Sequence, residues 1–222
     1  MKTKVSIISL KEHNHRAERL IADLNESGMT NVSITDAVNG KELTAIEYFN
    51  NMKCINSKLR GRKTLTPSEL GCFMSHKKAI EEFLSSDNET LIVLEDDVSL
   101  LNKSIYKNLT TSTFEIKNSC DVFILGGQDG LKSFNRVVLT GSGIYKSVFK
   151  PTIRFVYRTC SYMVNRKTAK EILSIMNETP FFADDWCLLL KKTNIQGLKF
   201  ARWFSHPLDI SNSTIESERK II

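Results

Sequence analysis

Cysteine is scarce in this sequence, and its spacing offers nothing that would crosslink a fold. There are five cysteines among 222 residues, and no two of them form a Cys-x-x-Cys pair. An odd number without that motif argues against a disulfide framework or a zinc site. We therefore expect reduced cysteines, as in a cytosolic protein.

Long apolar runs are also missing. The apolar segment at residues 5–10 is too short for a signal peptide, and no stretch approaches the length of a membrane span. The expectation is a cytoplasmic protein without a membrane helix.

Basic residues outnumber acidic ones but do not gather into a block. The net charge of +6 and the pI near 9.0 suit an anionic partner, such as a nucleotide or a phosphorylated lipid surface. Because the lysines and arginines are spread along the chain, no nucleic acid is expected as a partner.

The composition, 41% apolar and 25% charged, is ordinary for a globular protein, and no repeat or linker divides the chain. We expect one domain over residues 1–222.

Alternating strand and helix patterns predict an α/β sheet. A β-branched strand at residues 5–10 is followed by helical spacing from 17 to 24, which Gly28 ends, and by a second strand at 32–35. The intervening residues 11–15 are expected to form a loop on the ligand side of the sheet. Further strands are expected at 91–94, 121–127, 159–164 and 198–204, further helices at 66–84, 166–177 and 184–190, an irregular loop at 39–63, a hairpin or excursion at 131–157 and a frayed tail at 211–222.

The helix expected at 66–84 has a well-marked start. Thr66 and Glu69 form a capping box, and Pro67 suits the first turn. Gly71 lies inside the helix, where it costs about 1 kcal/mol relative to alanine, which suggests that something packs or binds closely there. His76 lies on the same helix face as Cys72; it is either a core histidine or a group near the sugar or phosphate of a ligand.

Three consecutive acids, Glu95, Asp96 and Asp97, directly follow the apolar run at 91–94. Such a run is typical of a strand buried on both faces, and ligands of open α/β sheets gather where these strands end. Adjacent carboxylates repel one another, and their oxygens select Mg²⁺, Mn²⁺ or Ca²⁺. On an extended backbone Glu95 and Asp97 point the same way and Asp96 points the other way. We predict a divalent cation held by Glu95 and Asp97, with a solvated turn as the alternative.

A second acidic pair, Asp184 and Asp185, precedes the helix expected to run to residue 190. Acids are favoured at a helix start because they cap it and complement its dipole. Capping therefore explains one of the two, and the other, beside Trp186, is a candidate functional group.

Several segments between residues 5 and 215 resemble, in the same order, glycosyltransferase family 25, the lipooligosaccharide-biosynthesis galactosyltransferases and their relatives. The most specific is the run at 65–76, Leu-Thr-Pro-Ser-Glu-Leu-Gly-Cys-Phe-Met-Ser-His, followed by the Glu95-Asp96-Asp97 strand. Weaker matches are at 7–10 with Arg16, at 161–165 with Ala169, at 184–186 and at 213–215. Ser9 departs from the family pattern, in which asparagine is usual at that position.

The resemblance implies a single-domain, GT-A-like (Rossmann-like) α/β sheet flanked by helices. It also implies an inverting, metal-dependent transfer of a hexose. The expected donor is UDP-galactose, and the expected hexose is galactose. Residues 1–125 would mainly bind the donor and the cation, 126–215 would supply the acceptor side and the base, and 216–222 would be a tail. The implied donor contacts are Leu10, Arg16, His76, Glu95 and Asp96.

In this resemblance the Glu95-x-Asp97 pattern is the counterpart of the family's metal-binding motif, with Mn²⁺ or Mg²⁺ as the cofactor. His206 is a candidate third ligand, a surface turn being its alternative. An inverting transfer needs a base for the acceptor hydroxyl, and Asp184 or Asp185 is the candidate, with the choice between them open.

The implied acceptor is a hydroxyl of a lipooligosaccharide or lipopolysaccharide type of glycan or glycolipid in a bacterium. Because such acceptors are often lipid-linked, peripheral contact with the anionic inner face of the cytoplasmic membrane is part of the expectation. Two other functions compete. One is a non-catalytic, Ca²⁺-dependent module that binds glycans or proteins. The other is a nucleotidyltransferase, for which a glycine-rich, basic phosphate loop after the first strand is missing.

Overall fold

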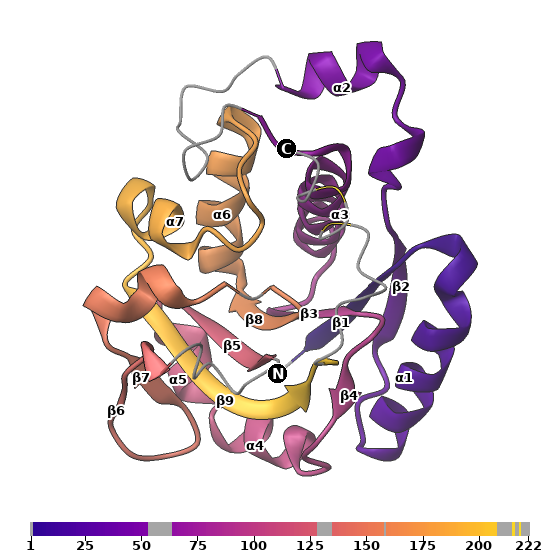
Figure 1. Cartoon of the computed structure of the whole chain (residues 1–222). Coiled ribbons are helices and arrows are strands. Elements are labelled where there is room, and N and C mark those ends of the chain that lie inside the picture. The colour runs from indigo at the N-terminus through magenta and orange to yellow at the C-terminus, as the bar shows by residue number, and fades with distance from the viewer. Residues whose placement is uncertain are drawn as a thin grey trace.

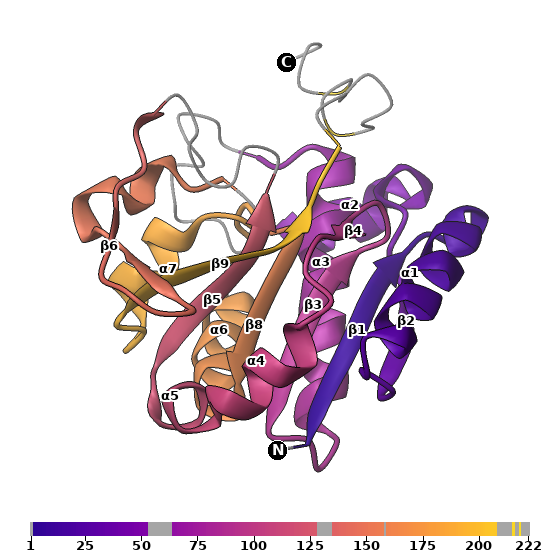
Figure 2. The same ribbon diagram turned by 90° about the horizontal axis from the view of Figure 1, so that it is seen from below.

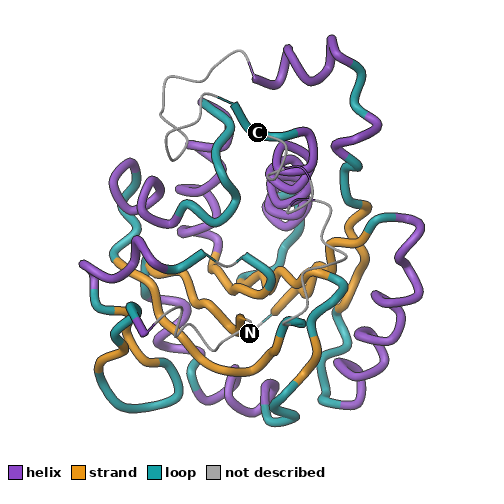
Figure 3. Tube along the Cα trace, viewed as in Figure 1, coloured by secondary structure: helices purple, strands orange, loops and turns teal. Residues whose placement is uncertain are grey.

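The computed structural model describes residues 2–52, 64–127, 135–157 and 159–207, together with residues 215 and 218. They build one mixed sheet with helices on both faces (Figures 1 and 3). The strands are β1 (Thr3–Ser9), β2 (Val32–Asp36), β3 (Thr90–Glu95), β4 (Ser99–Leu100), β5 (Asp121–Gly127), β6 (Leu139–Thr140), β7 (Lys146–Val148), β8 (Ser161–Asn165) and β9 (Gly197–Ser205). The α-helices are α1 (Asn14–Glu26), α2 (Ala45–Met52), α3 (Pro67–Leu84), α4 (Ile105–Thr111), α5 (Thr113–Asn118), α6 (Arg166–Glu178) and α7 (Trp186–Lys192). Short 3-10 turns are η1 (Lys11–His13), η2 (Gly40–Glu42) and η4 (Lys150–Phe155).

Each face of the sheet has its own apolar core. The apolar stripes of α3, α6 and α7 pack on one face, and those of α1, α4 and α5 pack on the other. Alternate residues of β3 belong to the two cores: Leu91 and Val93 to the first, Ile92 and Leu94 to the second. The strand is therefore buried on both faces, as the apolar run before the acids predicts.

The strand directions bring distant parts of the chain to one edge of the sheet. The strand order is β2-β1-β3-β8-β5-β9-β7-β6, with β4 paired to β9. β1 and β3 are parallel, as are β5 and β9, and β8 runs antiparallel to both β3 and β5. The carboxyl ends of β1, β3, β5 and β9 and the start of β8 consequently lie at the same edge, where Figure 2 shows β5 and β9 ending together.

Several of the elements expected from the sequence differ from those observed. The loop expected at 11–15 is instead η1 and the first turn of α1, and β3 extends one residue beyond the expected strand at 91–94 at each end. The strand β4 and the helices α4 and α5 were not predicted. The short β6–β7 pair confirms the hairpin expected within 131–157, and Gly141 and Gly143 in its bend have φ of +84° and +111°.

The loop expected at 39–63 is wrong for its first part, because η2 and α2 lie there; residues 53–63 lie outside the described part. The helix α2 starts at a second capping box: the Thr44 amide donates to the Glu47 carboxylate at 2.8 Å, and the Glu47 amide donates to the Thr44 hydroxyl at 3.2 Å.

Most of the tail expected to fray lies outside the described residues, but Glu218 does not fit that expectation. Its carboxylate accepts hydrogen bonds from the amide and the hydroxyl of Ser68, at 3.0 and 2.8 Å, at the start of α3. A carboxylate at a helix N-terminus complements the unpaired amides and the dipole there. No helix among the described residues is long and apolar enough to cross a membrane.

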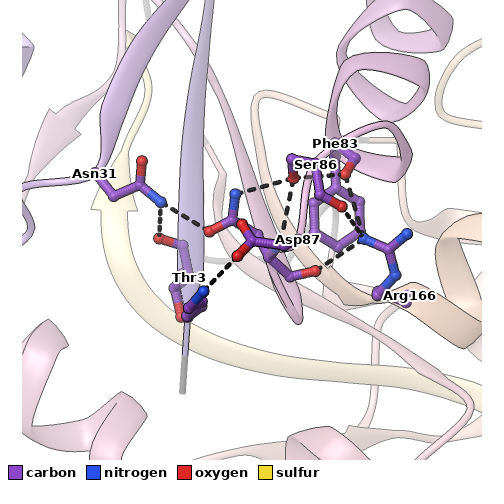
Figure 4. Close-up of polar contacts among 8 residues, drawn as sticks. Thr3, Asn31, Phe83, Ser86, Asp87 and Arg166 are labelled. Atoms are coloured by element: carbon purple, nitrogen blue, oxygen red, sulfur yellow. Dashed lines mark hydrogen bonds and ion pairs between the residues drawn. The ribbon is translucent and has the colours of Figure 1, made fainter.

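Arg166 fastens the turn between α3 and β3 at the edge opposite the acids (Figure 4). Its guanidinium donates to the carbonyls of Leu84, Ser86 and Asn88 at 2.7, 2.8 and 3.0 Å. Beside it, the Asn31 amide donates to the Asn88 side chain and to the Thr3 carbonyl, both at 2.9 Å, which joins β1 to the same turn. One charged group thus satisfies several carbonyls that the end of a helix leaves unpaired.

We predict that Arg166→Met lowers the free energy of unfolding by about 2–3 kcal/mol, the scale of losing hydrogen bonds from a charged donor. Urea unfolding followed by circular dichroism measures the change. Lys170→Met, an exposed position on the same helix α6, is the matched control and should leave the midpoint almost unchanged. Equal midpoints for both variants would contradict the fastening role.

Gly71 lies where α3 meets the chain before η2. A β-carbon at Gly71 would lie 2.6 Å from the Gly40 amide nitrogen and 2.6 Å from the Val38 carbonyl oxygen. Both are backbone atoms, which cannot turn aside as a flexible side chain can. This close approach confirms the packing that a glycine inside the helix suggests.

We predict that Gly71→Ala destabilises the protein by about 1–3 kcal/mol, the cost of overpacking, although alanine is the better helix former. The control is Gly197→Ala, where the nearest atom to an added β-carbon is the Asp121 Oδ1 at an ordinary 3.6 Å. Thermal unfolding of both variants tests the difference, and a Gly71→Ala protein as stable as the parent would overturn it.

Candidate active site

The acids form a turn at the carboxyl end of β3. The Glu95 amide donates to the Cys160 carbonyl at 2.8 Å, which keeps the end of β3 attached to the segment entering β8. Asp96 and Asp97 follow in the turn, and the Val98 amide returns toward the Glu95 carbonyl at 3.4 Å. Because of this turn, the three carboxylates contact different neighbours.

Glu95, Asp97 and His206 bring their side chains together. One ligand atom from each lies within 4.8 Å of the others, and His206 Nε2 lies 3.1 Å from Asp97 Oδ2. The pairing of β4 with β9 places them so, because Ser99 lies opposite Ser205 just after Asp97 and just before His206. The structure thus joins the three residues predicted as metal ligands.

The electrostatics of this cluster favour a cation among its oxygens. The second oxygen of Asp97, Oδ1, is buried and has no hydrogen-bond partner among the described residues. Burial lowers the pKa of His206, but its hydrogen bond to Asp97 and the charge of that carboxylate outweigh the burial, so the pKa of His206 is raised. Two carboxylates and an imidazole make a donor set that suits a divalent cation such as Mn²⁺.

Asp96 faces away from this cluster, toward β1, as the alternation along an extended chain predicts. The Ser9 hydroxyl donates to Asp96 Oδ2 at 2.7 Å, and Arg16 Nη1 lies 3.9 Å from Asp96 Oδ1. Burial is the main reason that the pKa of Asp96 is raised, against the hydrogen bond from Ser9. Ser9 was not predicted as a site residue, although its departure from the family pattern was the available signal.

The other expected donor contacts lie around the same edge. Leu10 follows β1, and its carbonyl accepts the His13 amide at 2.8 Å, which closes the η1 turn. The side chain of Arg16 is 41% exposed at the start of α1, whereas His76 is buried beneath the acids.

A row of rings connects the two acidic clusters. His76 Nε2 lies 3.6 Å from Glu95 Oε1, and the His76 ring stacks on Tyr162 with 5.6 Å between centroids. Tyr162 in turn meets the edge of Trp186, also at 5.6 Å. Trp186 directly follows Asp184 and Asp185 in the chain, so the row of rings ends at the residue after the second acidic pair.

The two later acids differ in their local roles. Asp185 is the N-cap of α7, since its Oδ1 accepts the Leu188 amide at 3.1 Å. Asp184 lies in the turn before it, and its carbonyl accepts the Trp186 amide at 2.9 Å. The capping expected for one of the two acids therefore falls on Asp185.

The chain is similar to proteins of one glycosyltransferase family. The model of glycosyltransferase family 25 (LPS biosynthesis protein) matches residues 2–188. A procollagen lysyl hydroxylase and glycosyltransferase of Acanthamoeba polyphaga mimivirus is 28% identical over 221 residues, 93% of this chain and 23% of the relative. Human procollagen galactosyltransferase 2 is 30% identical over 102 residues, and a human inactive glycosyltransferase 25 family member 3 is 34% identical over 99 residues; each match covers 43% of this chain and 16% of the relative.

The chain spans less than a quarter of the length of each of these relatives. The family match agrees with the mixed sheet and its flanking helices, and the predicted GT-A-like α/β fold class is confirmed.

Proposed function

Because the chain belongs to glycosyltransferase family 25, we propose that it transfers galactose from UDP-galactose to a hydroxyl of a glycan acceptor, with inversion and with a divalent cation. The family description supports a lipopolysaccharide-type acceptor, and the name of the human procollagen galactosyltransferase supports galactose. A glycolipid acceptor would bring the protein to the inner face of the cytoplasmic membrane.

One observation carries the proposal: the ligand atoms of Glu95, Asp97 and His206 converge within 4.8 Å at the ligand edge of the sheet. The buried, unpartnered Oδ1 of Asp97 is costly unless something charged or hydrogen-bonding meets it. A Mn²⁺ or Mg²⁺ ion bound by these residues would offset the charge that develops on the departing UDP diphosphate.

The surrounding residues prepare this edge for an anionic donor. Ser9 and Arg16 contact the Asp96 carboxylate and hold it away from Glu95, Asp97 and His206. His206 is held against Asp97 by the pairing of β4 with β9, which fixes its direction before any ligand arrives. Side chains held in place by strand pairing need little reorganisation when charge develops.

The acceptor hydroxyl must lose a proton as it attacks, and we assign Asp184 to take it. The carboxylate of Asp185 serves the N-terminus of α7, whereas Asp184 lies in the turn that precedes this helix. A carboxylate within hydrogen-bond reach of the hydroxyl suffices for this step. The Trp186 and Tyr162 rings are each 2% exposed, so they support this turn from within the core.

A non-catalytic binding module is the second candidate, and one relative's name favours it. Human family member 3 is described as inactive, so a chain of this family need not transfer sugar. Release of UDP from UDP-galactose separates the two functions, because a binding module leaves the donor intact. Parallel assays with UDP-glucose and with UDP-N-acetylhexosamines test the choice of sugar.

We predict that Asp97→Ala abolishes UDP release and acceptor transfer while the protein stays folded. The parent enzyme should lose activity in EDTA and regain it with Mn²⁺ or Mg²⁺, since Asp97 is the central ligand of the cluster. Asp23→Ala removes an exposed carboxylate of α1 and is the matched control. Full activity of the Asp97→Ala protein in EDTA would end the metal hypothesis.

We predict that Asp184→Asn lowers turnover by about 10²-fold or more, the usual scale for loss of a general base, with donor binding largely kept. Asp185→Asn should be nearly silent, because asparagine caps a helix about as well as aspartate does. Steady-state kinetics with saturating donor compare the two isosteric changes. The reverse ranking would move the base to Asp185, and normal turnover in both would place it elsewhere.

A further inference from the structure

A second group of ligand atoms shares Glu95 with the first and adds Cys72 and His76, which the proposed transfer does not use. Cys72 and His76 are one turn apart on α3, so both side chains project from the same face of the helix. One ligand atom each from Cys72, His76 and Glu95 lies within 4.8 Å of the others. Thiol, imidazole and carboxylate thus converge at one point.

His76 supplies the independent sign that something binds there. The residue is 1% exposed, and its Nε2 is buried without a hydrogen-bond partner among the described residues. The neighbouring Glu95 Oε1 is 3.6 Å away, which is too long for a hydrogen bond. A buried ring nitrogen without a hydrogen bond destabilises the folded protein, and a bound ion would remove that penalty.

The other ring nitrogen of His76 has the contact typical of a metal ligand. His76 Nδ1 lies 3.2 Å from the Tyr162 hydroxyl, and Tyr162 is itself buried in the core. When Nδ1 carries the proton and donates it to this hydroxyl, Nε2 keeps its lone pair on the side of Glu95 Oε1. An outer partner of this kind fixes the tautomer and the ring direction of metal-binding histidines.

We infer that Cys72, His76 and Glu95 form a site for a thiophilic divalent cation of the Zn²⁺ class. A thiolate and an imidazole select such ions over Mg²⁺, and three protein ligands leave a fourth position for water. Ligands around zinc lie about 3.3–3.8 Å apart, so atoms within 4.8 Å need only small side-chain rotations. The Cys72 thiol gives up its proton to solvent on binding.

Because Glu95 is shared, a cation bound at this site would affect the proposed transfer. This part of the inference rests on that proposed function. Glu95 belongs to both ligand groups, with Asp97 and His206 on one side and with Cys72 and His76 on the other. A Zn²⁺ ion that engages Glu95 withdraws it from the cation that serves the donor. Zinc therefore acts as an inhibitor that competes with Mn²⁺ through one carboxylate.

Titration of the whole protein with Co²⁺ tests the site without any assay of activity. Cobalt bound to a thiolate absorbs in the near ultraviolet by charge transfer, and cobalt bound only to oxygen and nitrogen does not. We expect this band in the parent protein and its loss in Cys72→Ser, with Zn²⁺ displacing it stoichiometrically. Cys187→Ser, which changes a similarly half-buried cysteine on α7, is the control and should keep the band.

The site would be overturned if the band were absent in the folded parent protein or persisted in Cys72→Ser. The contact between His76 and Glu95 would then be an ion pair only. Circular dichroism of each variant confirms folding.

The same variants then test the competition separately from the site. Zinc should inhibit UDP release, and its inhibition constant should rise at least about tenfold in Cys72→Ser, since even outer-sphere changes cost that much. Equal zinc sensitivity of the parent and of Cys72→Ser, with the cobalt band present in the parent and lost in the variant, would reject the competition and keep the site.

Discussion

Repulsion between three successive carboxylates is the constraint on which this edge of the molecule depends. Each carboxylate contacts a polar or charged side chain from a different element. Asp96 receives the Ser9 hydroxyl from the end of β1, with Arg16 of α1 nearby. Asp97 receives His206 from the end of β9. Glu95 faces His76 of α3, with the Thr159 hydroxyl at 3.4 Å. Without these neighbours, charges so close together would push the turn apart or bind protons.

These neighbours meet because of strand direction rather than proximity in the chain. The parallel register of β1 and β3 sets Ile8 opposite Glu95, so Ser9 lies beside the acid turn. The antiparallel β8 begins where β3 ends, and β9 returns to the same edge and pairs with β4. The core helices on the two faces hold the sheet, and the site is the place where its strands finish.

The parts of this arrangement that could be predicted depend on local chemistry. The capping box at Thr66 fixed the start of α3, and the apolar run before Glu95 fixed the buried strand, because each signal lies within a few residues. The capping box at Thr44 and Glu47 was equally local but was hidden by the polar, basic composition around it. The departure of Ser9 from the family pattern marks its position but not its partner, because the contact with Asp96 depends on the register of two strands far apart in sequence. The donor set of Cys72, His76 and Glu95 joins a helix to a strand, which no spacing rule for cysteines detects.

The pairing of β4 with β9 also sets the order in which a growing chain acquires its ligands. Glu95 and Asp97 leave the ribosome early, while β9 and His206 are the last described strand and the residue directly after it. A nascent chain therefore carries a bare acidic turn while residues 98–206 are being synthesised, and closes it only when β9 docks against β5 and β4. Completion of the three-residue cluster thus reports that translation has passed residue 206 and that the far half of the sheet has folded.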